Sequence, residues 1–320
     1  MATKDQNEVA QEKFLDDTTA PAPEQPKKRA DNKIEFPTVE NTDPRHAKIG
    51  WYGIAQNELP YEGRLYPKNW EFKIRAITGN ELAYYSTIDS NDPISVLDGM
   101  NMVIKNCLRI QGPEGLVDPM NVYEIDRMFF LLKIRDLSLP ERENALVIRE
   151  KCPFKCSDSE NQVEITANSL VYEPLSEFAE KYIDTERGGF TVKTKSLGDI
   201  HFTPSTLEQA EAFKTWFMNQ NPESRDSRFA TRYNLYLNRD KSYRKPEQMI
   251  VDAFNNFYAI SVDRNKISVY MKIEREIQPK LSQEMKYICP NCGKEVHTAF
   301  RFPGELSDIF LTNNIDSEFL

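Results

Sequence analysis

The fold is decided by two short stretches, CPFKC at residues 152–156 and CPNCG at residues 289–293. Each stretch carries two cysteines with three or two residues between them and a proline after the first, and this spacing lets a tight turn aim both sulfurs at one metal ion. Two such turns supply four thiolates for a tetrahedral site: Cys152, Cys156, Cys289 and Cys292. We therefore expect one structural Zn²⁺, with no coordination position left for catalytic water.

Strand-like runs flank both cysteine turns. They lie at residues 146–149 and 163–165 around the first turn and at 285–288 and 296–300 around the second. Strand, turn and strand on each side predict a zinc ribbon that is split by an insertion of more than a hundred residues. Closing so long a loop costs chain entropy, and metal binding would offset that cost on folding.

Two other interpretations of these residues are possible. His297 could replace a cysteine as ligand, although its place in a strand five residues after Cys292 disfavours this. Cys289 and Cys292 could form a thioredoxin-like redox pair, but that motif needs a helix after the first cysteine, whereas Gly293 and a β-rich run follow here. The fifth cysteine, Cys107, falls on the apolar face of an expected helix and is interpreted as a small buried residue.

Hydrophobic periodicity predicts the remaining elements. Alternation at residues 70–76 indicates a strand, and a helix capped by Thr78 or Asn80 should follow. Further helices are expected from Asp92, from Asp118 to about residue 137, and from Ser205 or Thr206 and Asp263, with a β-hairpin at 190–202. The predicted fold class is α+β and mainly helical, with a discontinuous zinc-ribbon module closed by two cysteine knuckles around a helical insertion.

These patterns divide the chain into parts with different compositions. We expect a disordered arm rich in proline and charge, an N-terminal β/helical domain, the split zinc ribbon in two pieces, an α+β insertion and a C-terminal tail. Their boundaries are 1–47, 48–145, 146–172 with 281–311, 173–280 and 312–320.

Composition excludes several functional classes. The 41 basic and 50 acidic residues give a net charge of −9, which disfavours sequence-independent binding to nucleic acid or to an anionic membrane. The longest apolar runs fall far short of the roughly 20 residues that span a bilayer. The first residues lack the apolar core of a signal peptide, so we expect an intracellular origin without stable disulfides.

Catalytic motifs are not evident in the sequence. There is no phosphate-binding loop, dinucleotide fingerprint or metalloprotease histidine pair, and the chain has only 3 histidines. We therefore expect a protein that is not an enzyme and binds no small-molecule substrate. One alternative is a zinc-ribbon regulator that binds nucleic acid through the basic and tyrosine-rich stretch at 225–245. Another is a thiol oxidoreductase that uses Cys289 and Cys292.

Several motifs, in this order, resemble those of baseplate hub and hub-assembly proteins of T4-like tailed bacteriophages. They are LPYEGRLYP at 59–67, FKIRAIT at 72–78, DR at 126–127 ahead of FFLLKIR at 129–135, the first cysteine turn, GDIHFTPS at 198–205 and the second cysteine turn. The resemblance covers residues 51 to 311.

The resemblance implies a virion or virion-assembly protein of the tail baseplate, assembled in the host cytoplasm. Its partners would be other phage tail proteins, and it supplies no catalytic residues. Exposed aromatic side chains suit such protein contacts, and Trp51, Tyr52, Tyr61 and Tyr66 are the candidates.

Overall fold

The computed structural model describes residues 50–139, 145–157, 160–195, 198–218, 264–302 and 309–310. Contacts along the chain separate Met1–Thr42 from Asp43–Leu320, and every described residue belongs to the second unit. The expected disordered arm, the basic stretch at 225–245 and the tail at 312–320 lie outside the described residues. No helix within the described ranges is both long and apolar enough to cross a membrane.

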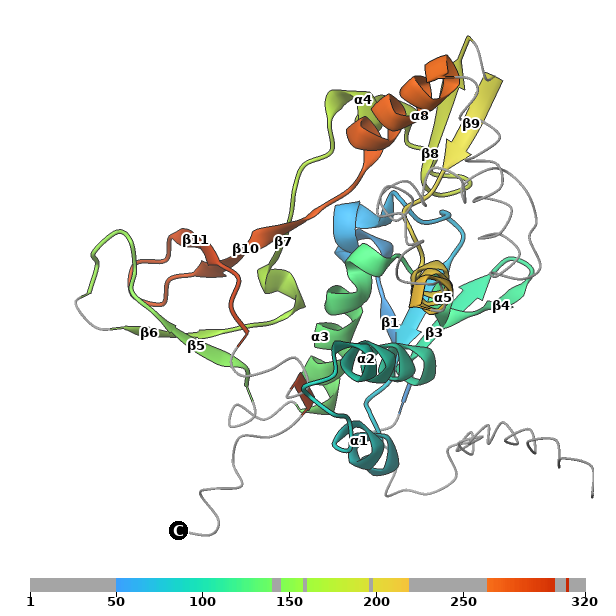
Figure 1. The fold of residues 1–320 in the computed structure, drawn as a ribbon. Helices are drawn as coiled ribbons and strands as arrows, with labels where there is room; N and C mark the ends of the chain where they lie inside the picture. The colour runs from blue at the N-terminus through green and yellow to red at the C-terminus, as the bar shows by residue number, and fades with distance from the viewer. Residues whose placement is uncertain are drawn as a thin grey trace, which may run out of the picture. The chain divides into compact units, whose positions relative to one another are not determined.

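A four-stranded antiparallel sheet organises the N-terminal part (Figure 1). Its strands, in spatial order, are β1 (Tyr52–Ile54), β2 (Glu71–Ile74), β3 (Leu108–Gly112) and β4 (Gly115–Val117). Successive residues of a strand point to opposite faces, so Phe72 and Ile74 are buried while Glu71 is exposed. Phe72 lies opposite Ile110 of β3, and both belong to the hydrophobic core.

Three helices accompany this sheet: α1 (Gly79–Tyr85), α2 (Pro93–Cys107) and α3 (Arg127–Ser138). Thr78 begins α1 with a capping box, as expected, because its hydroxyl accepts from the Glu81 amide and the Glu81 carboxylate accepts from the Thr78 amide. Asp92 caps α2 ahead of Pro93 by accepting from the Ile94 amide at 3.0 Å. α2 packs against α3 and β3.

Cys107 lies at the end of α2 and is fully buried, which confirms the prediction for this residue. The helix expected from Asp118, however, begins later than predicted. Two single 3₁₀ turns, Pro119–Asn121 and Glu124–Asp126, precede α3. The side chain of Asp118 caps the first of these turns by accepting from the Met120 amide, so Asp118 begins a short 3₁₀ turn rather than α3.

Residues near the C-terminus complete the core of the N-terminal part. Ile309 and Phe310 are both fully buried. The Ile309 carbonyl accepts a 2.6 Å hydrogen bond from Nε of Arg135 in α3, and the Phe310 ring meets the Tyr85 ring edge-on at 5.2 Å. This core therefore includes side chains from both ends of the sequence.

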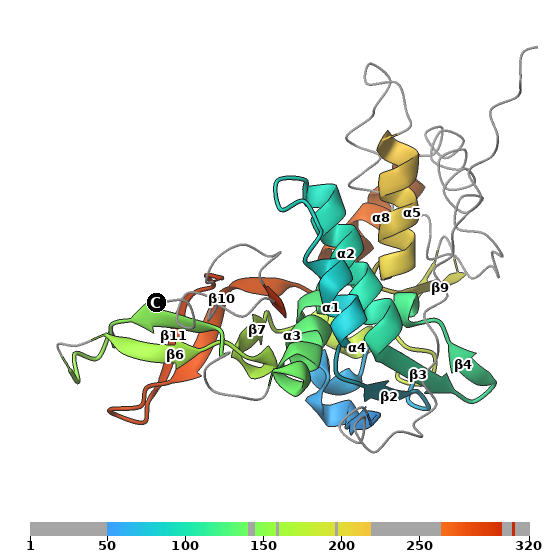
Figure 2. The same ribbon diagram turned by 90° about the horizontal axis from the view of Figure 1, so that it is seen from below.

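The remaining strands form three small sheets. β5 (Val147–Glu150) pairs with β6 (Asn161–Glu164), and β7 (Leu170–Tyr172), β10 (Leu281–Ile288) and β11 (Glu295–Ala299) form a sheet in the order β11-β10-β7. The β5–β6 and β10–β11 hairpins lie side by side, as Figures 1 and 2 both show. The third sheet is the hairpin of β8 (Phe190–Thr194) and β9 (Gly198–Phe202), and this hairpin was expected.

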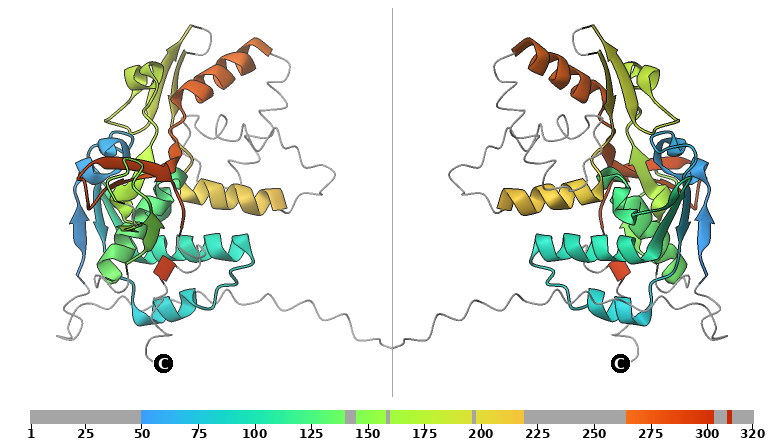
Figure 3. Two further views of the ribbon diagram at one scale, coloured as in Figure 1. Left: turned by 90° about the vertical axis from the view of Figure 1, so that its left-hand side faces the viewer. Right: turned by 90° about the vertical axis from the view of Figure 1, so that its right-hand side faces the viewer.

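The insertion also contributes helices α4 (Glu177–Tyr182), α5 (Leu207–Met218) and α8 (Arg264–Ile277). α5 lies beside α2 (Figure 3, gold and teal), and Nζ of Lys214 is 2.6 Å from Oδ1 of Asp98. α4 contacts both α8 and β8. The insertion thus has its own helices and hairpin and also contacts the N-terminal part.

The prediction of a mainly helical fold is wrong. The described residues form six α-helices and eleven strands, and the strands make four antiparallel sheets. Three of the unexpected strands, β1, β4 and β7, have only three residues each, too few to display a period of two. β3 follows α2 without a break, so its apolar residues continue the apolar pattern of the helix.

The loop that follows β1 joins several parts of the structure. Tyr61, Glu62 and Gly63 all have positive φ, so the chain turns sharply there. The hydroxyl of the next tyrosine, Tyr66, donates a 2.7 Å hydrogen bond to the carboxylate of Asp126 and accepts one at 3.0 Å from the Tyr123 amide. The interpretation of Tyr66 as a surface aromatic is therefore wrong, because its side chain is buried.

Gly188 and Gly189 dock the start of the β8–β9 hairpin on the same loop. The Gly189 amide donates to the Leu65 carbonyl at 2.7 Å, and both glycines have positive φ. A Cβ on Gly188 would approach the Leu65 carbonyl oxygen to 2.9 Å, and one on Gly189 would overlap the Phe202 carbonyl. Only glycine allows the two backbones to approach so closely.

Asp126 is a buried acid among tyrosines. The hydroxyl of neighbouring Tyr172 lies close to this carboxyl and, like that of Tyr66 but to a smaller extent, lowers its pKa by hydrogen bonding. Burial raises the pKa of Asp126 from 3.8 to about 7, and hydrogen bonding from Tyr66 only partly opposes that shift. The folded state thus favours the protonated acid.

This pKa predicts how stability depends on pH. A carboxyl whose pKa is raised on folding stabilises the folded state fully below its unfolded pKa, near pH 4. This contribution to the unfolding free energy is lost as the pH rises through about 7, and it amounts to at most about 4 kcal/mol. Asp126→Asn keeps an acceptor for Tyr66 but cannot ionise. We expect its unfolding free energy, measured with urea between pH 4 and 8, to fall less steeply than that of the wild type. Asp199→Asn, exposed on β9, should retain the wild-type slope, and equal slopes for Asp126→Asn would contradict the assignment.

Candidate metal centre

Both cysteine turns lie at the tips of β-hairpins. The first connects β5 to β6 and carries Cys152 and Cys156, while the second connects β10 to β11 and carries Cys289 and Cys292. In the second turn the Gly293 amide donates to the Cys289 carbonyl at 2.8 Å. The strands hold each turn at its base, so four cysteines separated by up to 140 residues are brought to one place.

The sulfur atoms of all four cysteines lie within 4.8 Å of one another. Sγ of Cys152 is 3.8 Å from Sγ of Cys292, and Sγ of Cys156 is 3.6 Å from Sγ of Cys289. Metal–sulfur bonds of about 2.3 Å in a tetrahedron place neighbouring sulfurs about 3.8 Å apart. The cluster therefore has the dimensions of a tetrahedral metal site, and these four cysteines could hold a metal ion.

Disulfide bonds do not explain the cluster. The sulfur–sulfur distances of 3.6 and 3.8 Å are far longer than the roughly 2.05 Å of a covalent bond. All five cysteines of the chain are free thiols in the structure. The close approach of four sulfurs therefore suits a cation bound by thiolates, which these cysteines could hold.

Cys289 is the best prepared of the four to bind as a thiolate. Burial raises the pKa of its thiol, but the backbone amides of Cys292 and Asn291 point at the sulfur and outweigh this effect, so the pKa falls to about 6. Nδ2 of Asn161 donates to the same sulfur at 3.5 Å. Asn291 in turn donates to Oδ1 of Asn161 at 2.7 Å, which fixes the orientation of that amide.

Cys156 is at the open side of the cluster. Its side chain is exposed, whereas Cys152 and Cys289 are buried and Cys292 is intermediate. Hydrogen bonding with the Cys152 sulfur is the main cause that raises the pKa of Cys156 to about 12. A further negative charge is therefore unfavourable beside the other sulfurs unless a cation joins them.

Basic residues near the turns make other contacts. Nζ of Lys294 lies 4.6 Å from the centre of the Phe154 ring, a cation–π contact between the two hairpins. Arg301 lies 4.0 Å from Glu150. Phe154 is about half exposed, so the Lys294 contact covers one face of an otherwise accessible ring.

The alternatives considered for these residues fit the structure less well. His297 is not part of the sulfur cluster, and its imidazole instead lies 3.1 Å from Glu295 and 3.7 Å from Glu284. After Cys289 and Cys292 the chain forms β11, whereas a thioredoxin-like pair needs a helix there. Sequence reasoning missed Asn161 and Asn291, because an asparagine at the start of a strand or inside a cysteine turn carries no signal that it will support a sulfur.

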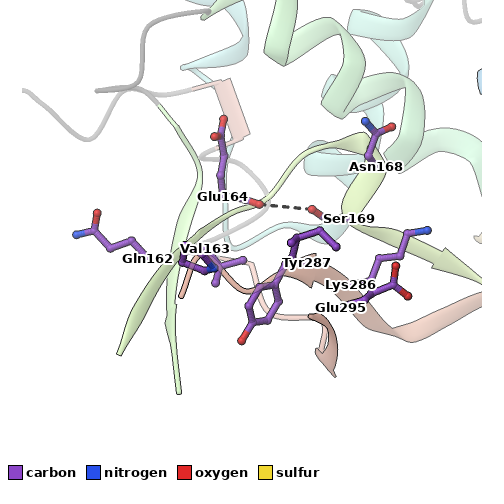
Figure 4. A pocket seen from close by; sticks show the side chains of 10 residues that line it. Gln162, Val163, Glu164, Asn168, Ser169, Lys286, Tyr287 and Glu295 are labelled. Carbon is purple, nitrogen blue, oxygen red and sulfur yellow. Dashed lines mark hydrogen bonds between the residues drawn. The ribbon is translucent and has the colours of Figure 1, made fainter. Parts of the chain in front are cut away.

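A pocket of about 440 Å³ lies beside the cluster, between β6 and the β10–β11 hairpin (Figure 4). Its lining includes no cysteine or histidine, and Ser169 donates its hydroxyl proton to the Glu164 carbonyl at 3.4 Å. Lys286 and Glu295 lie close together at one side of it (Figure 4). The lining thus offers mixed polar and apolar contacts.

The chain has no counterpart among the proteins with which it was compared: no family model, curated protein or solved structure matches it.

The backbone of the two turns predicts opposite effects on the unfolding free energy for substitutions at Gly293 and at Lys155. Gly293 and Lys155 both have positive φ, at 68° and 52°, and a Cβ on Gly293 would meet no other atom. Gly293→Ala should lower the unfolding free energy by about 1 kcal/mol through backbone strain alone, whereas Lys155→Gly should leave it unchanged or raise it by up to about 1 kcal/mol. Denaturant unfolding of both variants checks this. A stabilising Gly293→Ala would contradict it.

Proposed function

We propose that the four cysteines hold one structural Zn²⁺. The observation that carries this proposal is the tetrahedral spacing of four sulfurs, 3.6 and 3.8 Å across the two turns. Thiolates are soft ligands that favour zinc over magnesium or calcium, and four of them leave no open position for a substrate or water. Two of the sulfurs are buried, which also suits a structural ion.

The proposed ion stabilises the fold by closing a long loop. Cys156 and Cys289 are 133 residues apart, and closing a loop of that length costs the flexible chain roughly 4–5 kcal/mol. Metal–thiolate bonds offset this cost in the folded state only. Phe154 and Ile288, which flank the turns, are both exposed, so the metal supplies a link at the turns that these two side chains do not.

Metal analysis tests this assignment. The purified chain should contain one zinc ion, measured by plasma mass spectrometry, and Cys289→Ser should retain less than a tenth of it. Cys107→Ala is the matched control, because Cys107 is buried in the other part of the fold and should leave the zinc content unchanged. A chelator should lower the unfolding free energy of the wild type by several kcal/mol, roughly the loop-closure cost. Iron in place of zinc, or no metal, would contradict the proposal.

We further propose that the chain is a non-enzymatic component or assembly factor of a phage tail baseplate. The ordered motifs shared with baseplate hub and hub-assembly proteins support this role, and so does a metal centre suited to structure rather than chemistry. Such a protein would act through contacts with other tail proteins. Trp51 and Tyr52 provide a candidate surface, since both are more than 40% exposed next to the edge of the first sheet.

A contact with Arg75 holds one of the two aromatic side chains of the candidate surface in place. The guanidinium carbon of Arg75 lies 5.9 Å from the centre of the Trp51 ring, so the indole is held by a cation–π contact while it stays accessible. Tyr61 is excluded from this surface, because its hydroxyl donates to the Lys280 carbonyl and accepts from the Lys280 amide. Tyr61 instead joins the N-terminal loop to the start of β10.

Two measurements check the baseplate role. Mass spectrometry of purified tailed particles from the encoding phage should detect the chain at low copy if it stays in the virion, and in tail-assembly intermediates alone if it is an assembly factor. Absence from both would contradict the role.

Within those complexes, replacement of both Trp51 and Tyr52 by alanine should reduce recovery of the chain at least tenfold, because exposed aromatic anchors dominate protein interfaces. Tyr84→Ala is the control, since Tyr84 is equally exposed on α1. Equal losses in both variants would exclude the candidate surface.

A further inference from the structure

The four cysteines of the metal centre differ in their access to solvent. Cys156 is exposed, whereas Cys152 and Cys289 are buried and Cys292 is intermediate. The residues before Cys156 in its turn, 153–155, are exposed as well. A small dissolved molecule can therefore reach the sulfur of Cys156 directly, while protein atoms cover the sulfurs of Cys152 and Cys289.

The exposed sulfur has a sulfur neighbour on the other hairpin. Sγ of Cys156 lies 3.6 Å from Sγ of Cys289, and Sγ of Cys152 lies 3.8 Å from Sγ of Cys292. Both contacts cross from the β5–β6 turn to the β10–β11 turn. A disulfide needs about 2.05 Å between its sulfurs, so a relative shift of about 1.6 Å at the turn tips is enough to join Cys156 to Cys289.

An accessible thiolate with a second sulfur beside it is typical of cysteines that react with peroxides. The peroxide oxidises the first thiolate to a sulfenic acid, and the second sulfur condenses with it to give a disulfide. Metal ligation favours this chemistry, because a cysteine binds a metal ion as the thiolate. By contrast, Cys107 is fully buried, and its sulfur contacts a carboxylate oxygen of Glu81 at 3.8 Å.

We propose that Cys156 is a site of modification by peroxides, and that its oxidation joins it to Cys289 and releases the metal ion. The inference rests on the proposed zinc site and deepens it by naming a reaction that empties the site. It requires hydrogen peroxide, or another peroxide, as the oxidant.

The reaction has two steps that balance. First, the Cys156 thiolate attacks one peroxide oxygen, the O–O bond breaks, and the products are a sulfenic acid and hydroxide. Second, the Cys289 thiolate attacks the sulfenic sulfur, an S–S bond forms, and a second hydroxide leaves. The two thiolates lose two electrons and the peroxide gains them. The zinc ion then retains only two of its four ligands.

The pairing of the cysteines determines what oxidation does to the fold. Cys156 and Cys289 are 133 residues apart, so their disulfide closes the same long loop that the proposed metal ion closes. One link between the hairpins then replaces another, and the hairpins stay joined after the ion leaves. A disulfide within either turn would release the ion and leave the loop open.

Disulfides within each turn are the competing outcome. All four sulfurs lie within 4.8 Å of one another, so distance alone does not exclude them. Two observations favour the pair that crosses between hairpins. Sγ of Cys156 is already in contact with Sγ of Cys289, and the buried amide of Asn161 in β6 donates to the Cys289 sulfur at 3.5 Å. This hydrogen bond holds the Cys289 sulfur toward the first hairpin.

The experiment treats the zinc-loaded full chain with hydrogen peroxide and follows zinc release with a coloured chelator. Non-reducing peptide mapping by mass spectrometry then identifies the disulfide. We expect zinc release to match the yield of a peptide linked through Cys156 and Cys289, with Cys107 unmodified. A thiol reductant and added zinc should restore the metal content.

Urea unfolding supplies a second readout. The oxidised, metal-free chain should unfold at a higher urea concentration than the reduced chain from which a chelator has removed the metal, because the disulfide keeps the long loop closed. Equal unfolding midpoints would show that the disulfide does not join the hairpins.

Two histidine variants separate the role of Cys156 from the change of ligand. Cys156→His retains four zinc ligands, because three cysteines and one histidine form a common zinc site, but it cannot form the disulfide. It should release zinc to peroxide about tenfold more slowly than the wild type. Cys292→His is the matched control, since it makes the same ligand change and leaves Cys156 and Cys289 in place. Its release rate should stay within about threefold of the wild type.

Three results would overturn the inference: a disulfide within one turn in place of the Cys156–Cys289 link, zinc release with Cys156 unmodified, or equal release rates for Cys156→His and Cys292→His. Peptide mapping of the wild type decides the pairing even where a histidine variant loses its zinc. A wild-type chain without metal would reject the zinc site and the release step. A Cys156–Cys289 link formed by peroxide in that chain would still support the modification site.

Discussion

Four sulfur atoms within 4.8 Å of one another are the constraint on which the C-terminal half of the structure depends. The hairpins that carry them, β5–β6 and β10–β11, belong to different sheets and expose Val147, Phe154 and Ile288 to solvent. Small sheets of two or three strands bury too little apolar surface to be stable alone. The cysteine turns, the bond from Asn291 to Asn161 and the Lys294–Phe154 contact link the two hairpins, beside the buried core residues Val163, Met285 and Val296.

A second junction, at the loop of residues 60–67, ties the cysteine hairpins and the insertion to the N-terminal part. Tyr61 bonds to both backbone groups of Lys280, just before β10. Arg64 forms two hydrogen bonds with Glu180 of α4, at 2.6 and 3.1 Å, and Leu65 accepts from Gly189. The loop thus contacts the insertion at three places, so the insertion is attached to the N-terminal part as well as to the cysteine turns.

The sequence was sufficient to predict the local features with strong chemical signals. Cysteine spacing predicted which four residues would meet, and the helix starts at Thr78 and Asp92 followed from capping chemistry. The sequence was insufficient where tertiary contacts determine the local structure. Strands of three residues show no periodicity, the apolar face of α2 runs directly into β3, and nothing local marks Asp126 or Tyr66 as a buried pair rather than surface groups. The contact between Tyr66 and Asp126 joins residues that are 60 positions apart in the sequence.

The placement of Ile309 and Phe310 sets an order of events during translation. Both residues fill the core of the N-terminal part, against Arg135 and Tyr85, so that core stays incomplete until residue 310 has left the ribosome. The first cysteine turn likewise waits for more than a hundred further residues before its counterpart emerges. The N-terminal part therefore completes its core only after the 174 positions that separate Arg135 from Ile309 have been made, and until then two thiols and an open apolar core are accessible to chaperones and to oxidants.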